Sequence, residues 1–178
     1  MTDAAIDLKL KNLFNGMDAN NDGYVEWADY QRVIDWYLTV FRTDKDTRKG
    51  LALQVGYQML WLELLRHANG DQRLSRDEYV AANRATSVDT SRFNMVEGIP
   101  HALFDIIDSN DDDKISKEEF AELMKLWRIT ASDAMETFTM LDRDRDGHIS
   151  RQEFLRATWK LAYAADLATP GSLHFEHL

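Results

Sequence analysis

Apolar residues recur along this chain at helical spacing, in segments separated by short acidic runs. Before the first run, five of them fall on one face of a predicted helix: Ile6, Leu10, Leu13, Phe14 and Met17. After that run a second stripe extends from Trp27 to Phe41. The same order of helix, acidic loop and helix recurs around residues 108–119 and 142–153. Repetition of one unit predicts an all-α protein built from copies of it.

A fourth unit lies between the first two acidic runs. We expect Leu51, Val55, Leu62 and Leu65 to form the inward stripe of the helix that leads into its loop. Aligning Leu74 with Val25, Ile115 and Ile149 places the loops at 18–29, 67–78, 108–119 and 142–153, called loops one to four below. The units then form two tightly packed pairs, a domain over 1–88 and a domain over 89–178. We expect the C-terminal tail, with Leu173 and Phe175, to fold onto the body.

Composition supports helices and narrows the possible partners. The chain has only 8 Gly and 2 Pro among 178 residues, too few for the many turns of a sandwich or barrel. Its 31 acidic and 21 basic residues give a net charge of −10, which argues against binding to nucleic acid or to an anionic membrane. With no Cys, disulfides and thiol chemistry are excluded.

The N-terminal residues and the apolar runs lack the features of a secretory signal or a membrane span. We therefore expect a soluble, cytoplasmic and monomeric protein. The histidines His101, His148 and His174 have no evident nucleophile beside them, so we do not expect an enzyme.

Loop four matches a twelve-residue calcium-binding pattern at every defining position. The alternating carboxylates of Asp142, Asp144 and Asp146 point into one concavity, and Gly147 takes the sharp turn. The backbone carbonyl of His148 and both oxygens of Glu153 complete a cage of hard oxygen ligands.

Loop three keeps the same ligand positions with one departure. We expect the ion to be held by the side chains of Asp108, Asn110, Asp112 and Glu119 and by the carbonyl of Lys114. The sixth position is Asp113 instead of Gly. Asp adopts the left-handed backbone conformation more readily than most residues, so we expect this loop to bind as well.

Loop one departs at its last position. Its expected ligands are the side chains of Asp18, Asn20, Asp22 and Asp29 and the carbonyl of Tyr24. Asp29 is one methylene shorter than Glu, so it supplies a second oxygen less readily. Because Mg²⁺ takes fewer ligands than Ca²⁺, loop one is the loop in which Mg²⁺ is possible.

Loop two lacks the key ligand positions. His67 stands at its first position and Gln72 at its sixth, and a neutral imidazole is a poor ligand for Ca²⁺. Ser75 and Glu78 keep the helix-capping pair of the other loops. We therefore expect loop two to bind no ion and to pair its short strand with that of loop one.

The net charge is consistent with three bound ions. The predicted carboxylate ligands number ten: Asp18, Asp22, Asp29, Asp108, Asp112, Glu119, Asp142, Asp144, Asp146 and Glu153. Three divalent ions carry +6, which would change the net charge from −10 to −4. Three such loops in register, each between apolar helices, are not explained as ordinary solvated surface.

With these loops the whole chain resembles a four-unit EF-hand protein, and it is most similar to the sarcoplasmic calcium-binding proteins and calerythrin. The defective second loop, the Ala28-Asp29-Tyr30 segment, the short link between the halves and the tail with Pro170-Gly171 and Phe175 carry that resemblance. It implies an intracellular Ca²⁺ buffer or a Ca²⁺-dependent signal protein without catalysis.

Two alternatives to a buffer remain at this stage. A calcium sensor would expose an apolar surface to a protein target, whereas we expect the Met residues on the stripes (17, 59, 124, 135 and 140) to pack in the core. A carrier resembling luciferin-binding proteins would line a cavity with aromatic and His side chains. Its candidate lining is Trp36, Tyr57, Trp61, His101, Trp127, Trp159, Tyr163 and His174. A dense aromatic core is the interpretation we favour.

Overall fold

The computed structural model describes residues 3–88, 98–126 and 129–163, and the side chains of 6–86, 98–126 and 129–158. These ranges contain eight helices and four very short strands, which confirms the predicted all-α class. The elements are α1 (Asp3–Met17), β1 (Tyr24–Glu26), α2 (Trp27–Val40), α3 (Arg48–Leu65), β2 (Arg73–Ser75), α4 (Arg76–Val88), α6 (Gly98–Ile107), β3 (Lys114–Ile115), α7 (Lys117–Leu126), α8 (Ala131–Leu141), β4 (Ile149–Ser150) and α9 (Arg151–Tyr163).

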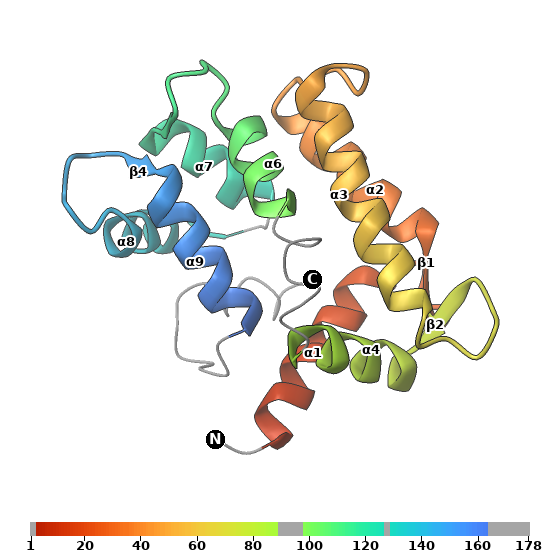
Figure 1. The fold of residues 1–178 in the computed structure, drawn as a ribbon. Helices are drawn as coiled ribbons and strands as arrows, with labels where there is room; N and C mark the ends of the chain where they lie inside the picture. The colour runs from red at the N-terminus through yellow and green to blue at the C-terminus, as the bar shows by residue number, and fades with distance from the viewer. Residues whose placement is uncertain (1–2, 89–97, 127–128, 164–178) are drawn as a thin grey trace.

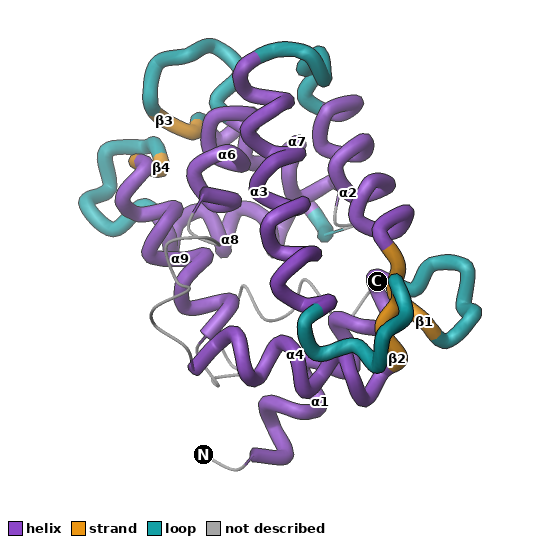
Figure 2. Tube along the Cα trace, turned by 45° about the vertical axis from the view of Figure 1, so that its right-hand side comes forward, coloured by secondary structure: helices purple, strands orange, loops and turns teal. Residues whose placement is uncertain are grey.

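The helices form two groups, each joined by one pair of strands (Figure 1). In the first group β1 pairs antiparallel with β2, and Val25 lies opposite Leu74. In the second group β3 pairs antiparallel with β4, and Ile115 lies opposite Ile149. The two strand pairs lie far apart, each beside the loops that it joins (Figure 2). The predicted pairing of loop one with loop two, and of loop three with loop four, is therefore confirmed.

Aromatic contacts repeat in both groups and hold helices from different units together. The rings of Phe14 in α1 and Tyr79 in α4 meet edge to face at 5.7 Å. In the second group, Phe104 meets Phe154 at 5.7 Å in the same way. Such pairs add to the stabilisation that burial of the rings provides. In each group the first helix is thus fixed against the last, with the loops at the helix ends.

The two groups also pack against each other, mainly through α3 and α6. Gly56 of α3 is buried where Ile99 of α6 crosses it. A Cβ atom at Gly56 would lie 2.9 Å from Cγ1 of Ile99, so any other residue here would force the Ile99 side chain or the helices to move. One continuous apolar cluster contains residues of both groups.

The predicted inward stripe of α3 was wrong. Leu51, Val55 and Leu62 are 49%, 57% and 55% exposed, and Leu65 is only partly buried. The face toward the core instead carries Gly50, Leu53, Gly56, Trp61 and Leu64. Because α3 has apolar residues on both faces, their spacing does not distinguish the two. The close contact with α6 selects the face that carries glycine.

Three of the five Met residues expected in the core are also on the surface. Met17 and Met124 are buried, whereas Met59, Met135 and Met140 are 37%, 47% and 46% exposed. Their positions beside the apolar stripes place them at the edge of the buried face, where the long, flexible side chain tolerates water.

The starts of two helices follow from the residues found there. Pro100 lies in the first turn of α6, where its missing N–H removes no helical hydrogen bond. After α2 a polar connector leads to α3, which begins at Arg48. Thr47 caps this helix, and its Oγ1 accepts a hydrogen bond from the amide of Gly50 at 3.2 Å. The expected fold-back of the tail concerns residues outside the described ranges. None of the described helices combines the length and hydropathy needed to span a membrane.

Candidate metal centres

Loops one, three and four share one backbone conformation. Each has left-handed residues at its fourth and sixth positions: Asn21 and Gly23 (φ 54° and 86°), Asp111 and Asp113 (62° and 61°), and Arg145 and Gly147 (62° and 87°). Loop two has a left-handed residue only at its fourth position, Gly70. Gln72, at position six of loop two, therefore lacks the left-handed backbone conformation that the other three loops have at this position.

The first Asp of each of these loops is fixed by the loop's own amides. Oδ1 of Asp18 accepts from the amide of Asp22 at 3.1 Å, and its Oδ2 from Gly23 at 3.0 Å. Asp108 and Asp142 accept from the corresponding amides at 2.9–3.1 Å. All three first-position Asp residues are at most 8% exposed. Buried carboxylates require compensating charge or hydrogen bonds, and these loops supply the hydrogen bonds.

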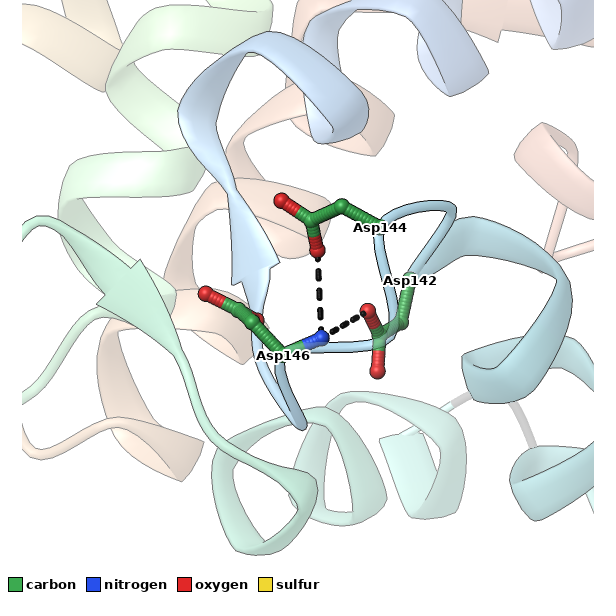
Figure 3. Close-up of side chains that lie close together, drawn as sticks. All are labelled: Asp142, Asp144 and Asp146. Carbon is green, nitrogen blue, oxygen red and sulfur yellow. Dashed lines mark hydrogen bonds between the residues drawn. The ribbon is translucent and has the colours of Figure 1, made fainter.

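Loop four brings three carboxylates together. Oxygens of Asp142, Asp144 and Asp146 all lie within 4.8 Å of one another, and the amide of Asp146 donates to Asp142 and to Asp144 at 3.1 Å (Figure 3). In loops one and three, position three is occupied by Asn20 and Asn110. The Oδ1 of each accepts a hydrogen bond from the amide at position five, at 3.1 Å. The predicted ligands at positions one, three and five therefore converge in all three loops.

The last Glu of loops three and four reaches across its loop. One oxygen of Glu153 accepts from the amide of Arg143 at 2.8 Å, and the other from the amide of Ser150 at 2.9 Å. Glu119 does the same with the amides of Ser109 and Ser116, both at 2.9 Å. Burial raises the pKa of each carboxyl, but these hydrogen bonds outweigh it, so each pKa lies below its ordinary value.

Asp29 of loop one makes a different set of contacts. Its Oδ2 accepts from the amide of Glu26 at 2.9 Å, as in the other loops. Its Oδ1 instead pairs with Nη1 of Arg32 at 3.1 Å. Nη2 of Arg32 donates to the carbonyl of Met17 at 2.7 Å. The shorter side chain thus turns one oxygen toward an arginine, and Arg32 ties the helix that enters the loop to the helix that leaves it.

Loop two keeps the cap but not the cage. Oε2 of Glu78 accepts from the amide and the hydroxyl of Ser75 at 2.9 and 2.6 Å, and its Oε1 accepts from Asn69. These bonds, led by that from the Ser75 hydroxyl, lower the pKa of Glu78. Asp71 pairs with Arg73 at 3.6 Å. Glu78 and Asp71 are thus bound to protein donors, and the bonds of Glu78 are those that Glu119 and Glu153 make in loops three and four.

Two basic side chains from other parts of the chain contact loop three. Nζ of Lys49 in α3 donates to the carbonyl of Asp108 at 2.7 Å and pairs with Asp111 at 2.6 Å. Arg151, which opens α9, pairs with Asp113 at 2.7 Å. Sequence reasoning missed both residues, because the partners are distant in sequence and the basic residues lie outside the ligand pattern.

Burial of Asp108 also has an electrostatic consequence. It raises the pKa of this carboxyl, although the amides of Asp112 and Asp113 and the charge of Lys49 act in the opposite direction. A bound cation would stabilise the ionised form that burial penalises. The donor set of loop three therefore fits a divalent cation.

Comparison with known proteins agrees with this geometry. Residues 10–34 match a family model described as EF hand, and residues 101–159 match one described as EF-hand domain pair. Calerythrin of Saccharopolyspora erythraea is 25% identical over 162 residues, covering 88% of this chain and 92% of that protein.

Solved structures show the same fold at low sequence identity. A sarcoplasmic calcium-binding protein from amphioxus superimposes with a TM-score of 0.72 at 18% identity, over 100% of this chain and 99% of that one. The magnesium-loaded ctenophore photoprotein apo-berovin, in which all three Ca²⁺-binding loops bind magnesium, gives 0.68 at 20% identity over 86% of each chain. The chain therefore carries EF-hand segments in both halves, and over most of its length it is similar to calerythrin and to a sarcoplasmic calcium-binding protein of the same fold.

Proposed function

We propose that the chain is a cytoplasmic calcium buffer that holds three ions, in loops 18–29, 108–119 and 142–153. The ligands are the side chains at positions one, three, five and twelve and the carbonyl at position seven of each loop. The observation that carries this proposal is the shared conformation of the three loops, in which the same amides orient the same carboxylates. Loop two, with its acids bound to Asn69, Ser75 and Arg73, is proposed to remain without an ion.

Packing of the helices supports a buffer over a sensor. Sensors open a groove between their helices when they bind Ca²⁺, whereas buffers barely open. Here Phe14–Tyr79, Phe104–Phe154 and the Phe120–Phe138 contact close each group across its helices. Opening would separate these buried rings, which would cost much of the stabilisation from their burial.

Magnesium occupancy of loop one is a further part of the proposal. Arg32 holds Oδ1 of Asp29, which leaves Oδ2 as the oxygen better placed for an ion. An ion that needs six ligands tolerates one carboxylate oxygen from this residue better than a larger ion with seven. Berovin, whose three loops bind magnesium, shows that this fold accommodates Mg²⁺.

One observation favours a sensor as the second candidate. The exposed face of α3 carries Leu51, Val55, Met59 and Leu62 over three helical turns, and exposed apolar patches of this kind mark interaction sites. A protein target could dock on this face.

A carrier of an apolar ligand has less support. Trp36, one of the expected lining residues, is 40% exposed, and Trp61 packs against Tyr30 with ring centroids 5.5 Å apart. Trp127, Trp159, Tyr163 and His174 lie outside the described side chains. A hollow of about 610 Å³ beside loops one and two is open and partly polar, and its lining includes Glu26, Asp71 and Arg73. Such a lining suits water better than an apolar ligand.

Binding of an apolar dye with and without Ca²⁺ separates buffer from sensor. A buffer should bind the same amount of dye or less when it is loaded with Ca²⁺. A sensor should bind more, and Val55→Gln on the exposed face of α3 should then reduce the increase. A Ca²⁺-dependent increase that Val55→Gln abolishes would replace the buffer with the sensor.

A further inference from the structure

Arg151 connects three elements of the C-terminal group. It is the tenth residue of loop four and the first residue of α9. Its Nη1 pairs with Asp105 of α6 at 2.7 Å, while Nε and Nη2 both contact Oδ1 of Asp113 at 2.8 and 2.7 Å. The guanidinium also lies over the ring of Phe104, 4.1 Å from its centroid. A planar group with several donors satisfies all these partners at once, which an ammonium cannot do.

Asp113 occupies the one position where loop three departs from the other binding loops. Its φ is 61°, in the left-handed region, where loops one and four have Gly23 and Gly147. A side chain in that region is strained, although Asp tolerates it better than most residues. The Asp113 side chain is 71% exposed, so packing does not hold it in place. Its contact with Arg151 is what fixes the side chain of this turn residue.

We propose that Arg151 is a positioning residue that holds Asp113 in its left-handed turn, so that a residue of loop four sets the ion affinity of loop three. The amide of Asp113 donates to Oδ2 of Asp108 at 2.9 Å, and this bond aims the first ligand of loop three. Arg151 thus acts on the ion through Asp113 and Asp108 without touching it. The inference rests on the proposed binding of Ca²⁺ by loops three and four.

A charge-conserving substitution separates geometry from electrostatics. Arg151→Lys keeps the positive charge but removes the forked contact with Asp105 and Asp113. Asp113→Gly gives the turn the residue that loops one and four have. Because glycine adopts the left-handed conformation without strain, this variant does not need the contact with Arg151. The double variant then shows whether Arg151 acts through Asp113, because a coupled pair departs from additivity. Arg156→Lys, at an exposed position of the same helix, is the matched control.

The measurement is a Ca²⁺ titration of the full chain followed by amide resonances in two-dimensional NMR. The amide of residue 113 reports on loop three and that of Gly147 on loop four, because each donates to the first Asp of its own loop. We expect Arg151→Lys to weaken Ca²⁺ binding in loop three about five- to tenfold, the order of the cost of an unsupported left-handed residue. In the same variant, the Ca²⁺ affinity of loop four should change by less than about twofold. In the Arg156→Lys control, the affinities of both loops should change by less than about twofold.

In the Asp113→Gly background, Arg151→Lys should change the affinity of loop three by less than about twofold. Equal losses from Arg151→Lys in both backgrounds, or no loss in either, would overturn the positioning role while leaving ion binding intact. If neither amide of the parent protein responded to Ca²⁺, the proposed function itself would fail. The parent titration thus distinguishes the two failures.

Discussion

The pair formed by loops one and two and the pair formed by loops three and four share a scaffold but differ at the positions proposed to hold ions. Both pairs are joined by two antiparallel strands with buried residues at position eight. Glu78 of loop two accepts from Ser75 at the same distance, 2.9 Å, as Glu153 of loop four from Ser150. The cap and the strand therefore persist in a loop that lacks an Asp at position one and a left-handed residue at position six.

That difference assigns separate roles to the positions of one loop. Position eight pairs the strands and position twelve caps the exit helix, because loop two retains both and still pairs with loop one. In the other loops position twelve is also a proposed ligand. Positions one and six build the ion cage, because the first Asp is oriented by the amide of the turn residue. If loop two holds no ion, as proposed, the first pair depends more on packing than the second pair. Its aromatic cluster of Tyr30, Tyr57 and Trp61 fits that role.

Removal of divalent ions should have the largest effect. A ligand at about 1,000 times its dissociation constant adds about 4 kcal/mol of stability per site, so chelation should lower the melting temperature strongly. Because two of the three sites lie in the second pair, hydrogen exchange should increase more over 98–163 than over 3–88. Thermal denaturation and hydrogen exchange, with Ca²⁺ and with chelator, measure both. Equal melting temperatures would refute ion-dependent stability, and equal exchange in the two pairs would refute the asymmetry.

Substitutions at position twelve should separate an ion ligand from a cap. Glu153→Gln removes the charged bidentate group of loop four, so calorimetry should show one fewer bound ion per chain. Glu78→Gln, at the same position of loop two, should leave the ion number unchanged. If Glu153→Gln bound as many ions as the parent, the ligand assignment of Glu153 would be wrong. A loss of an ion with Glu78→Gln would place a site in loop two.

The two faces of α3 provide a test of packing in the first pair. Leu53 is fully buried, so Leu53→Ala should cost about 2–5 kcal/mol of unfolding free energy. Leu51→Ala, on the exposed face, should change it by no more than about 0.5 kcal/mol. If packing dominates this pair, the cost of Leu53→Ala should be similar with Ca²⁺ and with chelator. Denaturant titration under both conditions checks this, and similar costs for Leu51→Ala and Leu53→Ala would contradict the described burial.

Ion selectivity in loop one should respond to the length of residue 29. Asp29→Glu allows the carboxylate to reach across the loop as Glu119 and Glu153 do, which favours the larger ion. We expect competition by Mg²⁺ for loop one to weaken by roughly tenfold, the order of effects seen when ligand orientation changes. Titration of Ca²⁺ at fixed Mg²⁺ measures it. Unchanged competition would direct attention to Glu26 at position nine, and Arg32→Gln then tests whether the arginine holds Asp29.

The sequence predicted the periodic and local features of this protein. The four units, the strand pairing and the convergence of Asp142, Asp144 and Asp146 follow from spacing within twelve residues or from the 3.6-residue period. The inward face of α3 did not follow, because that helix is apolar on both sides and its neighbour α6 decides the outcome through Gly56. The contacts of Lys49 and Arg151 with loop three join residues 38 to 62 positions apart, and no local pattern marks them.

The central claim is that loops one, three and four hold ions and loop two does not. A crystal structure of the full chain grown at saturating Ca²⁺, with the ions identified by anomalous scattering, tests this most directly. Three ions are expected, held by the ligands that begin at Asp18, Asp108 and Asp142. An ion held by Asn69, Asp71 and Glu78 in loop two, or an empty loop among the other three, would contradict the account.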